Sequence, residues 1–137
     1  YPKRLPSHTV SKGHTILDLG AEDFTAQAPH PVFDTTLRLK RLCQELEDPE
    51  VAVVMLDFIT GPGVARDPFT GFAEACARAK AQRPIIFIAS ICGSMEDPQD
   101  VARAHGLLAD AGMIVTKSNY QSTRLASAMM LALDKKG

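Results

Sequence analysis

The sequence has little net charge, few cysteines and no long apolar run, and each absence excludes a class of protein. Fifteen Lys and Arg residues are balanced by sixteen Asp and Glu, a net charge of -1, so bulk charge gives no sign of a nucleic-acid partner. The three cysteines, Cys43, Cys76 and Cys92, have no CxxC spacing. This excludes a disulfide framework and a zinc cluster, predicts no metal site, and suits a reducing, cytoplasmic compartment. No apolar run approaches about 18 residues, so we expect no membrane span.

The start of the chain lacks two further features. Residues 1–6 include no initiator Met and no apolar core of a signal peptide. We interpret residues 1–12 as a linker-like start, in a chain processed from a longer protein, and residues 13–137 as one domain. A content of 45% hydrophobic and 23% charged residues is typical of a globular domain.

Short apolar runs rich in Val and Ile alternate with amphipathic stretches along the domain. The runs predict strands buried on both faces at Thr15–Leu19, Val51–Phe58, Arg83–Ile91 and Met113–Thr116. Apolar residues at helical spacing predict a helix after each of them, at Leu39–Leu46, Phe69–Cys76, beyond Pro98 and at Leu125–Leu133. This order predicts an α/β fold, a flavodoxin-like three-layer sandwich with a parallel sheet of at least four strands.

Three acids stand where helices are expected to begin. Asp34, Asp67 and Asp97 each offer a side-chain acceptor to free N–H groups, and the last two precede a Pro suited to a first helical turn. Gly112 is expected to end the third helix with a positive φ. A capping acid also opposes anion binding at the same helix start.

Ligands of open parallel sheets bind at the carboxyl ends of the strands, so the turns after the strands are candidate sites. Glycines there would let a ligand approach the backbone, although plain turn geometry explains them equally well. In the turn after the last strand no acid caps the helix, which favours an anion contact there, with simple capping by Ser118 or Asn119 as the alternative. The candidate ligand-binding residues are Gly61, Gly63, Gly93, Ser94, Lys117, Ser118 and Asn119.

Histidines and cysteines supply the candidate catalytic groups. His30 stands between two prolines that stiffen its loop, so it is a candidate proton carrier, with a simple change of chain direction as the alternative. His105 is interpreted as a structural histidine. For all three cysteines we favour packing over nucleophilic catalysis, although Cys92 ends a strand beside a helix start.

Several segments resemble, in order, the motifs of the FdrA family, related to the succinyl-CoA synthetase α chain. The resemblance runs from about residue 13 to 132, nearly the whole chain. Each motif alone is too short to identify the family, and the resemblance depends on the occurrence of all of them in the same order. The segments are Thr15–Gly20, Pro29–Arg38, Asp48–Asp57, Ala89–Gln99 and Ala111–Val115, with Ser118–Asn119 after the strand.

The resemblance implies the carboxy-terminal, ligase-type domain of an acyl-CoA synthetase-like protein that transfers acyl or carbamoyl groups. It implies partners, either a CoA-binding domain of the same protein or companion subunits, and an oligomer. CoA and a nucleotide would belong to the full-length protein, with no cofactor bound by this domain alone. The synthetase carries a phosphorylated histidine in the loop that matches Gly93–Pro98. This loop has no histidine but has Glu96 and Asp97, so we expect no phosphohistidine.

Two alternatives remain open. The first is a non-catalytic docking domain within such an assembly. The second is a receiver-like phosphoacceptor domain, because Asp57, Ser90 and Lys117 end successive strands in the required order. That domain needs two adjacent acids after its first strand to hold Mg²⁺, whereas here only Asp18 lies in the expected strand.

Overall fold

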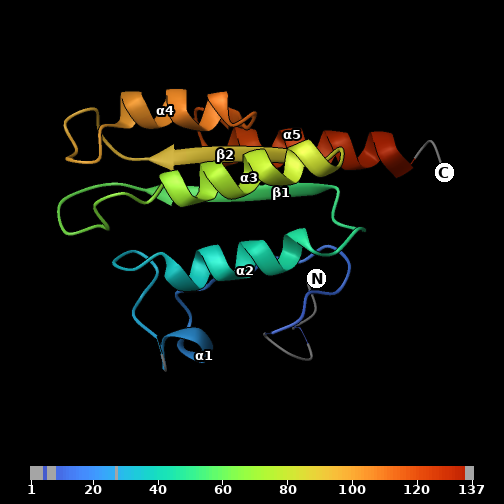
Figure 1. The fold of residues 1–137 in the computed structure, drawn as a ribbon, viewed down its shortest axis with the longest axis horizontal. Coiled ribbons are helices and arrows are strands. Elements are labelled where there is room, and N and C mark those ends of the chain that lie inside the picture. Colours follow the sequence, from blue (N-terminus) through green and yellow to red (C-terminus); the bar gives the residue numbers. More distant parts are fainter. Residues whose placement is uncertain (1–4, 6–8, 27, 135–137) are drawn as a thin grey trace.

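The computed structural model describes residues 5, 9–26 and 28–134, which alternate between helices and strands (Figure 1). Four of the helices are longer than two turns, and the first is a single turn. The elements are α1 (Glu22–Thr25), α2 (Thr36–Leu46), β1 (Val53–Ile59), α3 (Thr70–Gln82), β2 (Ile86–Cys92), α4 (Val101–Asp110), β3 (Ile114–Thr116) and α5 (Asn119–Asp134).

The strands form one parallel sheet in the order β1-β2-β3. Seven residue pairs join β1 to β2, from Val53 with Ile86 to Ile59 with Cys92, and three pairs join β2 to β3. Three of the four expected strands are therefore confirmed, with bounds shifted by up to three residues. The helices that connect them are the crossovers that parallel strands require.

The fourth expected strand, Thr15–Leu19, was wrong. The described part of the chain has three strands, and this segment is irregular. It bonds locally: Thr15 Oγ1 accepts from Lys12 N at 3.1 Å, and Asp18 Oδ1 accepts from Gly20 N at 3.0 Å. A strand is held by hydrogen bonds to a neighbouring strand, and within the described residues no strand pairs with Thr15–Leu19. Ile16 therefore remains 94% exposed.

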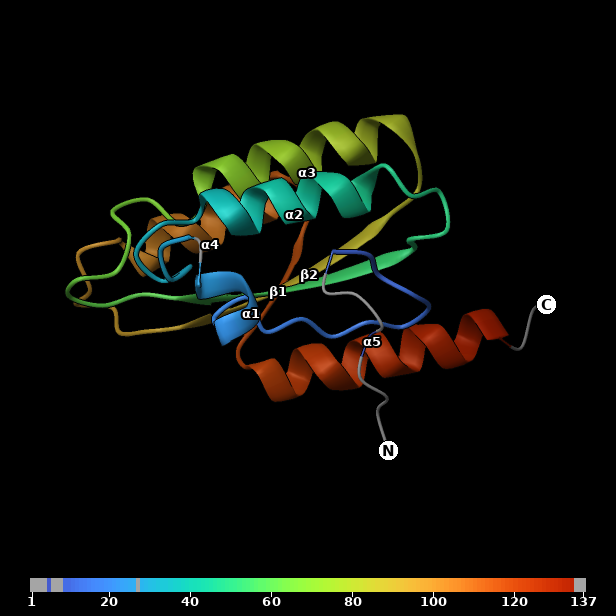
Figure 2. The same cartoon turned by 90° about the horizontal axis from the view of Figure 1, so that it is seen from below.

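Helices lie on both faces of the sheet: Figure 2 shows α2, α3 and α4 on one side and α5 on the other. The aromatic core lies on the α3 side, where the ring of Phe58 in β1 contacts Phe69 and Phe72 at centroid distances of 5.2 and 5.4 Å. Since side chains alternate along a strand, Asp57 faces the α5 side. β1 thus contributes Phe58 to the core on one face of the sheet and the carboxylate of Asp57 to the other face.

Two of the three expected capping acids bond near a helix start. Asp34 Oδ1 accepts from Thr36 N at 2.8 Å, and Asp67 Oδ1 accepts from Phe69 N and Thr70 N, both at 3.0 Å. The expectation for Asp97 was wrong, because α4 begins three residues after Pro98. Its N-cap is Asp100, which has a φ of 52° and accepts from Arg103 N at 3.0 Å.

Gly112 ends α4 as expected, with a φ of 80°, a conformation that other residues rarely adopt. A Cβ atom at this position would lie 2.8 Å from Lys80 Cε, and the Lys80 ammonium donates to the Gly112 carbonyl at 2.9 Å.

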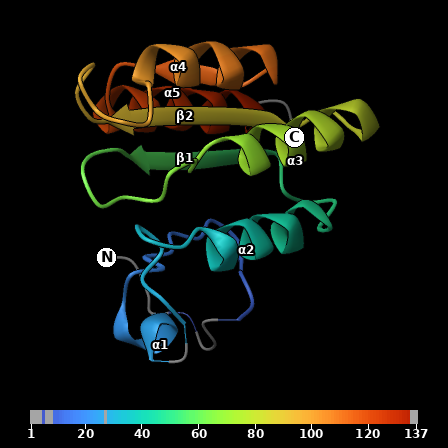
Figure 3. The same cartoon turned by 60° about the vertical axis from the view of Figure 1, so that its left-hand side comes forward.

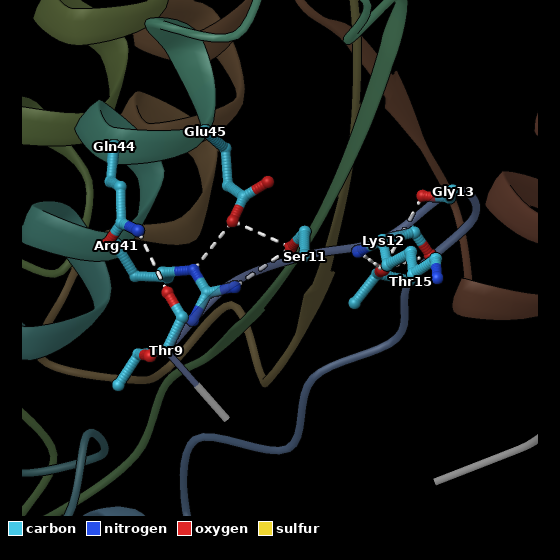
Figure 4. Close-up of polar contacts among 8 residues, drawn as sticks. All are labelled: Thr9, Ser11, Lys12, Gly13, Thr15, Arg41, Gln44 and Glu45. Carbon is cyan, nitrogen blue, oxygen red and sulfur yellow. Dashed lines mark hydrogen bonds and ion pairs between the residues drawn. The ribbon is translucent and has the colours of Figure 1, made fainter. Parts of the chain in front are cut away.

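The segment before residue 12 is bonded to α2 (Figure 4). Arg41 is buried and its guanidinium contacts Glu45 at 2.6 Å and the Ser11 hydroxyl at 2.8 Å. The Gln44 amide donates to the Thr9 carbonyl at 2.9 Å. Residues 9–11, within the range expected to be a linker, are therefore docked on α2.

Candidate functional site

An open groove of about 550 Å³ lies at the carboxyl ends of the strands. This is where ligands bind to parallel α/β sheets, because the strand ends and the helix starts that follow them meet there. Its walls combine apolar strand residues with a carboxylate, a thiol and an ammonium group. The lining residues are Asp57, Phe58, Ile59, Ser90, Ile91, Cys92, Gly93, Lys117, Ser118 and Asn119.

Asp57 lines this groove and accepts hydrogen bonds from two donors in different elements. It pairs with Ser90 in the β1–β2 register, so the two side chains lie side by side on the α5 face. The buried Ser90 hydroxyl donates to Asp57 Oδ1, and the Asn119 amide donates to Oδ2. Both carboxylate oxygens are hydrogen-bonded, which fixes the orientation of the group.

Arg38 of α2 supports the same strand end from the opposite face of the sheet. Its guanidinium lies 5.1 Å from the ring centre of Phe58 and 5.0 Å from that of Phe72, and Nη2 donates to the Asp57 carbonyl at 2.6 Å. Burial lowers the pKa of Arg38, and the negative charge of Asp57 opposes that shift. A desolvated cation therefore lies close to the carboxylate.

Gly93 lines the groove, whereas Ser94 does not. A Cβ atom at Gly93 would overlap the Thr60 hydroxyl and lie 2.7 Å from Asp97 Oδ2. Asp97 accepts from Thr60 Oγ1 at 2.5 Å and from Ser94 N at 2.7 Å, and these two bonds lower the pKa of Asp97. The Ser94 N–H is therefore already used within the turn.

Gly61 and Gly63 lie outside the groove lining, in a turn held by Gln99. Gln99 is buried; its Oε1 accepts from Gly61 N at 3.0 Å, and its Nε2 donates to Gly61 O at 3.0 Å. The two glycines have φ values of 142° and 84°. Turn geometry thus explains both of them. No local pattern predicts this role for Gln99, because its partners are backbone groups 34 to 38 residues away.

Lys117, Ser118 and Asn119 all line the groove. Ser118 Oγ accepts from Gln121 N at 3.3 Å, and Gln121 Oε1 accepts from Lys117 N at 3.1 Å, so this turn caps α5 as the alternative interpretation held. Lys117 is exposed, and no described acid lies within ion-pair distance of its ammonium group. An anion bound in the groove would lie near the positive charge of the Lys117 ammonium and the amino-terminal end of α5.

His30 does not belong to this groove. Its ring packs on Gly20, where a Cβ atom would lie 2.6 Å from Nε2, and Nδ1 accepts from Val32 N at 3.3 Å. These contacts hold the imidazole within its own loop. His105 is exposed on α4.

The cysteines differ from one another in burial. Cys76 is fully buried, and its burial raises the pKa of the thiol to about 12, as expected for a packing residue. Cys43 and Cys92 are exposed, so the burial expected of them as packing residues was wrong. Cys92 is one of the groove residues, because it is the last residue of β2 and the groove lies at the strand ends.

Asp57, Ser90 and Lys117 thus surround one groove, as a receiver-like domain would also require. Such a domain also needs two adjacent acids for Mg²⁺, whereas Asp18 accepts from Gly20 N in a turn outside the groove lining. Among the residues that the structure describes, no three His, Cys, Asp or Glu side chains form a group that could hold a metal ion.

The structure has a parallel α/β sheet and a groove at the strand ends that is lined by both apolar and polar residues. Comparison with known proteins identifies the family to which such a domain belongs. The model of the CoA-ligase family matches residues 4–129, so the chain belongs to that family. The chain is also 38% identical over 128 residues to the uncharacterized protein YahF of Escherichia coli (strain K12). That alignment covers 90% of this chain and 25% of YahF, so the chain spans about a quarter of this curated relative. In the described residues no helix is both long and apolar enough to span a membrane.

Proposed function

We propose that this chain is the ligase-type domain of an acyl-CoA synthetase-like, FdrA-type protein of the cytoplasm. It contributes the groove at the strand ends to acyl or carbamoyl group transfer, and other domains or companion subunits bind CoA and the nucleotide. Membership of the CoA-ligase family supports the class. The observation that carries the proposal is the groove itself, which places the Lys117 ammonium, the start of α5 and the held Asp57 carboxylate around one space.

The groove would bind an anionic group without a phosphohistidine. Residues 90–98 include no histidine, and the Asp97 carboxylate is bonded inside the loop. Glu96 is exposed nearby and adds negative charge. On the other side, Lys117 and the first N–H groups of α5 supply positive potential. A phosphate or acyl phosphate group would therefore bind against residues 117–119 rather than against residues 94–97.

Binding of acetyl phosphate and carbamoyl phosphate to the purified chain tests this proposal. Backbone amide signals of Gly93, Lys117 and Ser118 should shift on titration, and CoA alone should not shift them. Lys117→Gln should weaken binding about fivefold or more, as expected when one charged partner of an anion is lost. Lys40→Gln on α2 is the matched control and should bind normally. Absence of shifts with both acyl phosphates, or equal weakening in the two variants, would count against the proposal.

A non-catalytic docking role is the second candidate, favoured by apolar side chains exposed along β1. Met55 and Ile59 are 38% and 49% exposed, although strands of a parallel sheet are normally covered on both faces. We propose that the complete domain is flavodoxin-like with four or more strands, and that β1 is not an edge in that form. Two variants of the intact protein that contains this domain separate the two roles. If Lys117→Gln leaves turnover unchanged and a substitution of Met55 prevents assembly, docking is favoured over catalysis.

A further inference from the structure

Ser90 is a buried serine near the end of β2 and one of the residues that line the groove. In Figure 3 the ends of β1 and β2 lie side by side, with α5 behind them. The Ser90 hydroxyl donates across this strand pair to Asp57 Oδ1. Side-chain hydroxyls more often bond to backbone groups or water than to another side chain. Here a hydroxyl and a carboxylate that can accept its proton lie together in the wall of one groove.

Asp57 is oriented by a third side chain. The Asn119 amide donates to Oδ2, the carboxylate oxygen that Ser90 does not use. Asn119 Oδ1 in turn accepts from Thr123 Oγ1 at 3.4 Å, one turn further along α5. A hydroxyl, a base within hydrogen-bond distance and a group that orients the base are the parts of an activated serine nucleophile. Ser90, Asp57 and Asn119 supply these three parts from three different elements.

The same groove holds positive charge close to Ser90. Ser90 pairs with Thr116 in the β2–β3 register, and Lys117 follows directly after the end of β3. Lys117 lines the groove beside the amino-terminal end of α5. Positive charge in this position stabilises the negative charge that a phosphate group gains as it leaves. The groove therefore combines a nucleophile, a base and a site for an anionic leaving group.

Two other groove residues carry nucleophilic atoms, but neither has a base. Ser118 Oγ accepts from Gln121 N and caps α5. The Cys92 thiol is exposed at the end of β2. Among the hydrogen bonds of the described residues, Ser90 is the groove hydroxyl that donates to a carboxylate. The geometry thus distinguishes Ser90 from both.

We propose that Ser90 is a nucleophile that accepts the acyl group of an acyl phosphate. Its Oγ attacks the carbonyl carbon of a donor whose phosphate lies at Lys117, and the hydroxyl proton passes to Asp57. The bond between the carbonyl carbon and the bridging oxygen breaks, so inorganic phosphate leaves and Ser90 carries the acyl group as an ester. Asp57 then releases its proton to solvent, and a second substrate or water removes the acyl group.

The step rests on the proposed function, because it needs an acyl phosphate bound in the groove. The reactivity of the Ser90 hydroxyl toward an acyl donor without phosphate does not depend on that binding. The two can therefore be measured separately on the same chain.

Mass spectrometry of the 137-residue chain after incubation with acetyl phosphate is the first measurement. Acid quenching retains esters, so one acetyl group is expected on Ser90, located by fragmentation of its peptide. Ser90→Ala should lose this acetyl group, and Asp57→Asn should slow its formation about a hundredfold, as expected when a general base is removed. Ser94→Ala, at a serine outside the groove lining, is the matched control and should be acetylated like the wild type. Amide shifts at Lys117 report in the same samples whether acetyl phosphate binds.

p-Nitrophenyl acetate, an acyl donor without phosphate, is the second measurement. It should acetylate Ser90 whether or not acetyl phosphate binds, and again more slowly in Asp57→Asn. Ser90→Cys should restore acetylation at position 90, which separates loss of the nucleophile from a change in folding. Acetyl groups on Cys92 or Lys117 with Ser90 unmodified, or equal rates in the wild type and Asp57→Asn, overturn the inference.

The two measurements also separate this inference from the proposed function. Lys117 amide shifts with acetyl phosphate, but no acetylation of Ser90 by either donor, overturn the inference and leave the proposed function standing. Acetylation of Ser90 by p-nitrophenyl acetate, without Lys117 shifts on addition of acetyl phosphate, supports the nucleophile and counts against the proposed function.

Discussion

The turns at the carboxyl ends of the strands fall into two kinds. The turns after β1 and β2 bond to each other: Thr60 donates to Asp97, and Gln99 holds both backbone groups of Gly61. The turn after β3 bonds within itself and, through Asn119, to Asp57 of β1, and its side chains line the groove. The glycines of the first two turns therefore hold the architecture, whereas the polar residues of the third are placed to meet a ligand.

The largest expected effect on stability comes from closing the space at Gly93. In Gly93→Ala the new methyl group overlaps the Thr60 hydroxyl and approaches Asp97, so we expect a loss of about 2–4 kcal/mol in the free energy of unfolding. Urea unfolding measures it. Gly106→Ala on α4, where an added Cβ meets nothing within 4 Å, is the control and should stabilise by about 0.5–1 kcal/mol. Equal destabilisation by both changes would contradict the proposed contact.

Removing the Gln99 clamp should have the next largest effect. Gln99→Leu keeps the size of the side chain but leaves the buried Gly61 N–H and C=O without their partner, which costs about 1–3 kcal/mol. Unfolding measurements and hydrogen exchange at Gly61 should both report it. A change below about 0.5 kcal/mol would show that the two turns are not held together by this side chain.

Acid should loosen the same pair of turns. Hydrogen bonds from Thr60 and Ser94 lower the pKa of Asp97 from its ordinary value of 3.8, so the unfolded chain binds this proton more readily than the folded protein. The resulting stabilisation is complete above that ordinary value and is lost as pH falls through the lowered one. In Thr60→Val, melting temperatures between about pH 6 and pH 3 should fall less steeply than in the wild type. Parallel pH profiles would contradict the assignment.

The smallest effect on stability is expected in the third turn. Lys117 is exposed and has no ion pair with a described acid, so Lys117→Gln should change the free energy of unfolding by less than about 0.5 kcal/mol. The same variant should weaken acyl phosphate binding. A stability loss comparable to that of Gln99→Leu would mean that this turn is also architectural.

Local patterns predicted most of the fold. Apolar runs located β1, β2 and β3, and helical spacing located the four longer helices, because these signals reside in the segments themselves. The Thr15–Leu19 segment has the same kind of composition, yet a strand also needs a neighbour, which composition cannot supply. The start of α4 was missed for a related reason: Asp97 bonds Thr60, which lies 37 residues away.

The candidate site was predicted in part. Residues 117–119 and Gly93 lie in the groove because strand ends converge in any parallel sheet. Gly61, Gly63 and Ser94 lie outside its lining, since a glycine needed for a turn and one needed for a ligand look alike in sequence. Arg38 and Asn119 reach Asp57 from distant elements, so their roles required the structure.

Acetyl phosphate titration, followed residue by residue in the amide spectrum, tests the central claim most directly. If the groove binds the acyl phosphate, saturable shifts are expected at Gly93, Lys117 and Ser118, with Gly61 and Gly63 unchanged. Shifts at Gly61 and Gly63, with residues 117–119 silent, would contradict it.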